Sequence, residues 1–168
     1  MQNIIIERAA PEDAAALIEF LNQVGGETDN LTFGAEGLPI TVEAETEYLD
    51  RLKSSKDAIM LVAKTDGRII GNASLTRQTR RMNHRGSFAI SVLKEYWNHG
   101  IGGKLIAETI EFAKENAFGV IDLQVRSDNT SAIHLYEKFG FIKFGTHPEF
   151  FKINGEAIPF DYMYLLLK

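Results

Sequence analysis

A glycine-rich turn between an apolar run and a helical pattern is the feature that most constrains the fold of this chain. The run Phe88–Leu93 leads into the turn Trp97–Lys104, which reads Trp-Asn-His-Gly-Ile-Gly-Gly-Lys. Apolar residues then recur three or four positions apart, at Ile106, Ile110, Ala113 and Ala117. This order of strand, glycine turn and helix predicts a phosphate site, because glycines admit a ligand close to the backbone and a helix start offers unpaired N–H groups.

The spacing of the turn separates it from two common phosphate motifs. A dinucleotide fingerprint beginning at Gly100 needs glycine or alanine at the position of Leu105. A P-loop ending at Lys104 needs glycine at the position of Asn98 and serine or threonine at that of Leu105. The turn matches neither motif, so both nucleotide-binding interpretations are weak.

Apolar periodicities predict alternating strands and helices along the rest of the chain. Strands are expected at Asn3–Arg8, Ala58–Ala63, Arg68–Thr76, Val120–Val125, Phe141–Thr146 and Tyr162–Leu167. Helices are expected from Pro11 to a stop at Gly25-Gly26, from an N-cap at Thr41 to about Ser54, and over Asn129–Phe139. Connections are expected at a hairpin turn, Asp66-Gly67, at a loop, Glu27–Pro39, and at a longer loop with Gly155 and Pro159. The pattern predicts an α/β (α+β) fold in one domain, residues 1–168, with a mixed sheet of about seven strands flanked by about four helices.

The composition restricts the classes of function. The 168 residues lack both an apolar stretch long enough to span a membrane and a signal-peptide pattern, so we expect a cytoplasmic protein without a membrane role. The absence of cysteine excludes disulfides, thiolate zinc sites and a cysteine acyl-enzyme. The net charge of −5 argues against a general nucleic-acid binder. The basic segment Arg77–Arg85 is interpreted as a solvated hairpin loop, with contact to nucleic acid or an acidic substrate as the alternative.

Two segments resemble the GNAT superfamily of acyl-CoA-dependent N-acyltransferases. The family's pyrophosphate loop has the form Gln/Arg-x-x-Gly-x-Gly/Ala, which Gly100 and Gly102 match, although Trp97 stands at the Gln/Arg position. The segment 123–141, Leu-Gln-Val-Arg-Ser-Asp-Asn-Thr-Ser-Ala-Ile-His-Leu-Tyr-Glu-Lys-Phe-Gly-Phe, is similar to the family's other cofactor segment and lies at the family's distance from the loop. The resemblance covers roughly the second half of the domain. It implies an N-acetyltransferase that uses acetyl-CoA as acyl donor and no metal.

The resemblance also implies how acetyl-CoA would be held. The strand Phe88–Leu93 would separate from its neighbour, so that its main chain pairs with pantetheine, and the backbone amides of the turn would hold the pyrophosphate. Asn129 would contact the pantetheine arm, and it is also a suitable N-cap. The expected contacts are Ile90, Ser91, Val92, Trp97, Asn98, His99, Gly100, Ile101, Gly102, Gly103, Lys104, Asn129, Ala132, Tyr136 and Lys138.

Tyr136 is the expected catalytic residue. Amide formation from a thioester expels a thiolate with a pKa of about 8.5, which a phenol with a pKa of about 10 can protonate or hydrogen-bond. The helical spacing of Tyr136 with Ala132, Leu135 and Phe139 by itself favours a tyrosine packed into the core. The family resemblance favours a general acid.

The sequence defines the acceptor side less well. The expected acceptor is a primary amine of a small molecule or a protein N-terminus, which attacks directly in a ternary complex. Many relatives have a glutamate where this chain has Ser87, so the general base stays unassigned. Glu27, Asp29 and Glu149, together with Asp161, lie in segments that border the acceptor in relatives, and the acidic charge balance is compatible with a cationic amine. A non-catalytic acyl-CoA-binding module is the alternative, and a homodimer is left open.

Overall fold

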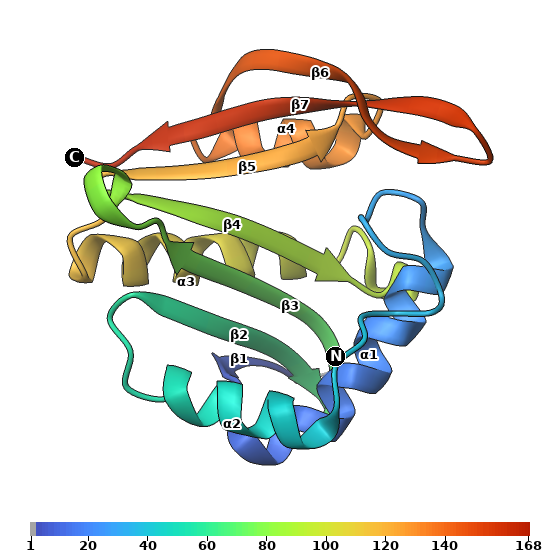
Figure 1. Ribbon diagram of the computed structural model, residues 1–168. Coiled ribbons are helices and arrows are strands. Elements are labelled where there is room, and N and C mark those ends of the chain that lie inside the picture. Colours follow the sequence, from blue (N-terminus) through green and yellow to red (C-terminus); the bar gives the residue numbers. More distant parts are fainter. Residues whose placement is uncertain (1–2) are drawn as a thin grey trace.

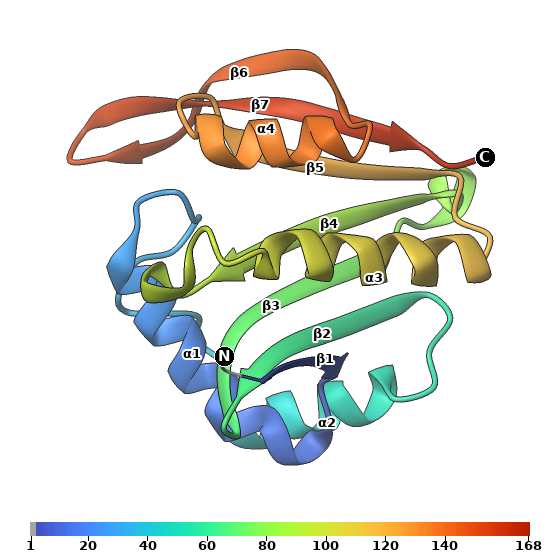
Figure 2. The ribbon, with the colours of Figure 1, turned by 180° about the vertical axis from the view of Figure 1, so that it is seen from behind.

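The computed structural model describes residues 3–168, which form one mixed sheet covered by helices on both faces (Figures 1 and 2). The strand order is β1-β2-β3-β4-β5-β7-β6, and every neighbouring pair is antiparallel except β4 and β5. The strands are β1 (Ile4–Arg8), β2 (Ala58–Thr65), β3 (Arg68–Arg77), β4 (Arg85–Val92), β5 (Val120–Arg126), β6 (Ile142–Ile153) and β7 (Glu156–Leu166), and the helices are α1 (Ala14–Glu27), α2 (Val42–Leu52), α3 (Ile101–Glu115) and α4 (Thr130–Lys138). The expected single domain with seven strands and four helices is confirmed. Within the described range, the helices are too short or too polar to cross a membrane.

The centre of the sheet is buried from both sides. Strand β3 is buried at every position from Ile69 to Ala73, because α1 and α2 lie on one face of the sheet and α3 lies on the other (Figure 2). Leu17 of α1, Leu49 of α2 and Leu105 of α3 are fully buried in the core that results. A strand covered on both faces is mostly apolar, as this segment is apart from the buried Asn72.

The glycine pair at the end of α1 does not stop the helix, contrary to the sequence prediction. Helix α1 continues through Gly25 and its neighbour to Glu27. A Cβ atom on Gly25 would lie 2.2 Å from the carbonyl oxygen of Gly34 and 2.9 Å from the ring of Phe33. Gly25 is therefore needed for the close approach of the loop that follows α1, and this loop forms one wall of the cavity described below.

The C-terminal region is a long hairpin, where the sequence prediction placed a short strand and a loop. The turn between β6 and β7 is Asn154-Gly155, with φ values of 50° and 78°. These left-handed values suit the type I′ turn that Asn-Gly favours, a signal that the sequence interpretation missed. Pro159 is tolerated within β7 because it lies opposite an irregularity of β6 between His147 and Phe151.

The predicted apolar face of α3 is correct except at its last position. The helix ends at Glu115, and Ala117 is an exposed residue with a φ of 59° in the turn to β5. The next residue, Phe118, is buried and packs against Phe112 with ring centroids 6.0 Å apart. Phe118, which follows the helix, thus makes the core contact that the apolar periodicity predicted for Ala117.

The parallel strands β4 and β5 pair only over a short distance. Their paired residues run from Arg85 with Val120 to Ser87 with Asp122, although both strands continue several residues further. Figure 1 shows the two strands diverging toward their C-terminal ends. The separation implied by the family resemblance is confirmed, and it leaves the β5-facing edge of β4 from Phe88 onward without a strand partner.

Candidate active site

A cavity of about 870 Å³ lies where β4 and β5 separate. Its walls are the C-terminal parts of both strands, the glycine turn with the start of α3, residues of α4 and its N-cap, the end of α1 with the loop after it, and two phenylalanines of the β6–β7 hairpin. Most of the expected cofactor residues line it: Ile90, Ser91, Val92, Trp97, Asn98, Gly100, Ile101, Gly102, Gly103, Asn129, Ala132, Tyr136 and Lys138. His99 and Lys104 are not part of this lining.

The glycine turn presents free backbone N–H groups at the start of α3. Gly100 caps the helix in the left-handed conformation, with a φ of 78°, and no side chain caps this end. The first helical hydrogen bond runs from the N–H of Lys104 to the carbonyl of Gly100, 3.2 Å away. The three N–H groups from Ile101 to Gly103 therefore have no partner within the helix. Free N–H groups at the positive end of a helix dipole suit a phosphate group.

Two contacts fix the position of this turn. The indole Nε1 of Trp97 donates a hydrogen bond to the carbonyl of Val92 at 2.8 Å, which ties the turn to the end of β4. A Cβ atom on Gly102 would lie 3.1 Å from the side chain of Leu135, so the glycine allows α4 to approach α3 closely. Trp97, at the Gln/Arg position of the family pattern, thus contacts the protein's own backbone through its side chain.

Asn129 begins α4 and also borders the cavity. Its Oδ1 accepts a hydrogen bond from the N–H of Ala132 at 3.3 Å, as an N-cap does. The residue is also part of the cavity lining. The capping interpretation is confirmed, while its contact with a ligand stays a prediction.

Tyr136 is packed into the core and faces the cavity at the same time. The side chain is 6% exposed, and its ring centroid lies 6.4 Å from that of Phe88 and 5.7 Å from that of Phe141. Burial raises the pKa of Tyr136 well above the usual value of about 10. The phenol therefore keeps its proton near neutral pH, as a proton donor must.

The acidic residues expected near the acceptor do not line the cavity. Glu27 accepts a hydrogen bond from the backbone N–H of Lys94 at 2.7 Å, which fixes the end of α1 against the segment after β4. Asp29 contributes only its backbone carbonyl, to Arg126 at 3.2 Å, and Glu149 is exposed on β6. None of the aspartates and glutamates that the structure describes belongs to the cavity lining.

Asp161 is buried away from the cavity in a polar cluster. Its Oδ1 accepts hydrogen bonds from Ser127 and Thr146 at 2.7 and 2.8 Å, and its Oδ2 lies 3.2 Å from the ammonium of Lys143. Burial alone would raise the pKa of Asp161, but these three partners outweigh burial and hold the pKa below its usual range. Asp161 is thus an ionised structural carboxylate that joins β6 to β7 and to the segment before α4.

The general base remains unassigned in the structure as in the sequence. Ser87, at the position where many relatives carry a glutamate, accepts a hydrogen bond from the side-chain amide of Gln78 at 2.5 Å and does not line the cavity. The described lining holds no carboxylate, and its polar side chains include Gln124 of β5 and the imidazole of His134, an exposed residue of α4.

The sequence analysis did not identify the aromatic wall of the cavity. Phe150 and Phe160 belong to the hairpin and stack with ring centroids 4.3 Å apart. Leu31 and Phe33 come from the loop after α1. Recognition of the Asn154-Gly155 turn would have placed Phe150 on a strand, but nothing local connects it with a loop more than a hundred residues earlier.

Arg126 at the end of β5 joins the same loop to the sheet. Its guanidinium forms a bidentate pair with Asp128, at 2.7 and 3.2 Å, and donates a third hydrogen bond to the carbonyl of Asp29. A planar guanidinium with its donors in fixed directions suits such a three-point contact. Arg126 therefore holds the loop after α1 beside the cavity.

The expected hairpin loop connects β3 to β4 between Gln78 and His84, whereas Arg77 and Arg85, at the ends of the basic segment, belong to the strands themselves. Arg77 pairs with Asp57 at 2.7 Å and lies over the ring of Phe118 at 3.9 Å, and Arg85 pairs with Asp122 at 2.8 Å. The arginines at both ends of the segment thus have structural partners.

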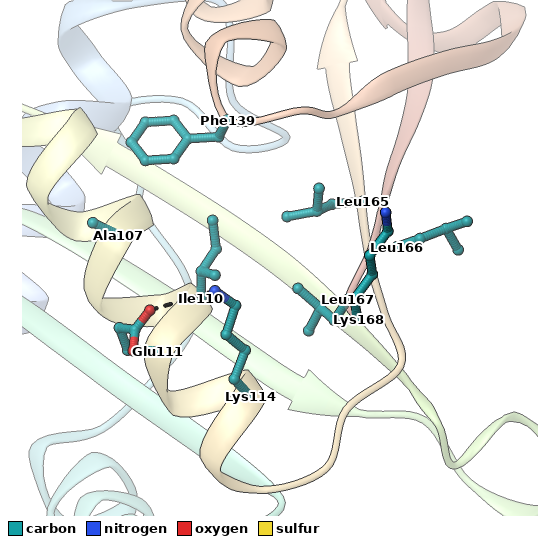
Figure 3. A pocket seen from close by; sticks show the side chains of 9 residues that line it. All are labelled: Ala107, Ile110, Glu111, Lys114, Phe139, Leu165, Leu166, Leu167 and Lys168. Carbon is teal, nitrogen blue, oxygen red and sulfur yellow. Dashed lines mark ion pairs between the residues drawn. The ribbon is translucent and has the colours of Figure 1, made fainter.

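A second hollow of about 440 Å³ lies between the far part of α3 and the end of β7 (Figure 3). Apolar side chains line most of it, with Lys168 and the ion pair of Glu111 and Lys114, 3.6 Å apart, at its border. It contains no residue of the glycine turn and none of the expected site residues. In residues 3–168 no group of three His, Asp or Glu side chains could hold a metal ion.

Comparisons with known proteins agree with this geometry. The family model described as "Acetyltransferase (GNAT) family" matches residues 29–141. The L-amino acid N-acetyltransferase AaaT of Escherichia coli is 30% identical over 97% of this chain and 98% of its own length. The acetyltransferase of the GNAT family from Streptococcus pneumoniae is 34% identical, with a TM-score of 0.95 over 98% of this chain and 100% of that one. A Salmonella typhimurium protein, yncA, solved with its cofactor acetyl-CoA, shares the fold at 20% identity, with a TM-score of 0.85 over 98% of this chain and 94% of that one.

The family match covers more than half of the chain and includes the glycine turn, the separated strands and α4. The first two relatives extend the agreement to nearly the whole length. The chain therefore belongs to the GNAT family of acetyltransferases.

Proposed function

We propose that this protein transfers an acetyl group from acetyl-CoA to a primary amine of a small molecule or a peptide N-terminus. One observation carries the proposal: the cavity between β4 and β5 connects the free N–H groups of the glycine turn with the buried phenol of Tyr136. The names of two similar proteins support it. The yncA structure contains acetyl-CoA, and the Escherichia coli relative is an L-amino acid N-acetyltransferase.

The donor would bind mainly through the backbone. The N–H groups from Ile101 to Gly103 suit its pyrophosphate. The unpaired edge of β4 from Ile90 to Val92 suits the amides of its pantetheine arm, because an extended chain can add to a free strand edge. Asn129 and Ala132 at the start of α4 border the same path.

The reaction follows from the groups available. The amine nitrogen attacks the thioester carbonyl, the new C–N bond forms as the C–S bond breaks, and the sulfur leaves with the electron pair. Tyr136 gives its proton to the thiolate and regains one from solvent. A backbone N–H near Val92 polarises the carbonyl oxygen. The amine releases its surplus proton to water, because no carboxylate of the described residues lines the cavity and the lining imidazole, His134, is exposed on α4.

The test is release of free CoA in the presence of acetyl-CoA and an amine. A thiol reagent follows CoA without background from the protein, because the chain has no cysteine. Amine-dependent release with at least one acceptor is expected. Binding of acetyl-CoA without release by any amine in a broad panel would favour the non-catalytic acyl-CoA-binding module. A homodimer and a cytoplasmic location stay predictions, to be tested by light scattering and by cell fractionation.

A further inference from the structure

We infer that the acceptor carries an apolar group beside its amine and has no second positive charge. The inference rests on the proposed acetyl transfer and concerns which amine the cavity admits. Two observations carry it: the charges of the cavity lining and the aromatic wall opposite α4.

The charge of the cavity differs from the charge of the whole protein. The chain has 23 acidic residues and a net charge of −5, yet no carboxylate belongs to the described cavity lining. Its charged side chains are Arg126, which is paired with Asp128, and Lys138, which is among the expected donor contacts. A second ammonium group on the acceptor would lose water here without gaining a carboxylate partner, which is unfavourable. The overall acidity, which in the sequence was compatible with a cationic amine, is therefore no guide to the acceptor.

The aromatic wall offers apolar surface that a ligand can cover. Phe160 is 3% exposed and supports Phe150, which stacks on it and is itself half-buried. Leu31 and Phe33 are also half-buried and border the cavity from the loop after α1. An apolar side chain placed among these residues would remove hydrocarbon surface from water on both partners, which favours its binding.

The same environment suits an amine that must react without a carboxylate base beside it. Removal from water without a carboxylate partner disfavours an ammonium ion, so it lowers the pKa of the bound amine. A larger fraction of the acceptor is then the neutral nucleophile. A carboxylate-free lining thus favours a single reacting amine and disfavours a diamine, whose second ammonium has to remain charged.

The first test compares three acceptors with the wild-type protein. L-norleucine has an apolar four-carbon side chain, L-lysine carries an ammonium at the end of such a chain, and glycine has no side chain. We expect kcat/KM for norleucine to exceed that for lysine and that for glycine by about 10- to 100-fold each. Equal or better use of lysine would refute this inference and leave the proposed function intact. No CoA release with any amine would refute the proposed function itself.

Two pairs of variants test the residues involved. Gln124→Glu adds a carboxylate to the cavity lining, and Gln78→Glu makes the same change outside it. We expect only Gln124→Glu to raise lysine use relative to norleucine, by about tenfold. Phe150→Ala should reduce the preference for norleucine over glycine by about tenfold, whereas Phe144→Ala, an exposed aromatic of the same strand outside the lining, should not. Unchanged selectivity in both cavity variants, at unfolding temperatures equal to wild type, would overturn the inference.

Discussion

Replacement of Tyr136 by phenylalanine separates its proposed chemical role from its structural one. Phenylalanine keeps the ring and its contacts with Phe88 and Phe141. The raised pKa of Tyr136 has burial as its cause, and no hydrogen bond from the described residues contributes to it. Removal of a hydroxyl without a protein partner should change the free energy of unfolding by less than about 1 kcal/mol. For a domain of this size that is a shift of less than about 3 °C in the unfolding midpoint.

The effect on catalysis should be much larger. General acid catalysis contributes about 100- to 10,000-fold to a rate, so kcat of Tyr136→Phe should fall by an amount in this range. The Kd for acetyl-CoA, measured by calorimetry, should change less than about threefold, because the proposed donor contacts are backbone groups of the turn and of β4. Turnover is followed with a thiol reagent, and unfolding by circular dichroism.

A matched control and the pH profile complete the test. Tyr164→Phe removes a hydroxyl outside the cavity lining and should leave kcat unchanged. Because burial raises the pKa of Tyr136, the wild-type rate should rise with pH as the amine loses its proton, without a falling limb below about pH 10. A Tyr136→Phe variant with more than half of the wild-type kcat would refute the role as general acid.

Three further predictions concern the loop, the cap and the kinetic order. Gly25→Ala forces the Gly34 carbonyl to move, so it should lower the free energy of unfolding in urea by about 1 to 3 kcal/mol and raise KM for the acceptor. An unchanged free energy of unfolding would contradict the packing argument. Asn129→Ala removes the cap of α4 and should lower the free energy of unfolding by about 1 kcal/mol. If Asn129 also contacts the donor, the variant should have a higher KM for acetyl-CoA. Direct attack in a ternary complex should give intersecting double-reciprocal lines in initial-rate measurements. Mass spectrometry after incubation with acetyl-CoA alone should show the unmodified chain, which has no cysteine. An acetyl-enzyme on any residue would exclude direct attack.

The parts of the fold that local patterns determine could be predicted from the sequence. The glycine turn, the hairpin at Asp66-Gly67 and the Asn129 cap each depend on residues close to one another in the chain, and each is confirmed. Gly25 shows the limit of such reasoning. A glycine near a helix end usually marks a stop, but this one is required by a contact with Gly34, which only the folded chain reveals.

The acceptor side depends on contacts between distant segments, so the sequence could not define it. Leu31 and Phe150 border one cavity although more than a hundred residues separate them. The acidic residues of the neighbouring segments are compatible with a cationic acceptor in the sequence, but Glu27 accepts a hydrogen bond from the backbone N–H of Lys94. Charge counted along a chain does not give the charge that lines a cavity.

The short parallel ladder between β4 and β5 also has a consequence for stability. It is the place where the antiparallel group β1 to β4 joins the group β5, β7 and β6, and its pairing ends at Ser87 and Asp122. A donor bound along this junction contacts both groups, so part of its binding free energy opposes their separation. Saturation at about 100 times Kd would add about 2.7 kcal/mol to the free energy of unfolding. The bound acetyl donor would thus hold the two groups of strands together reversibly. Amide hydrogen exchange at the C-terminal ends of β4 and β5 should therefore slow most when the donor binds.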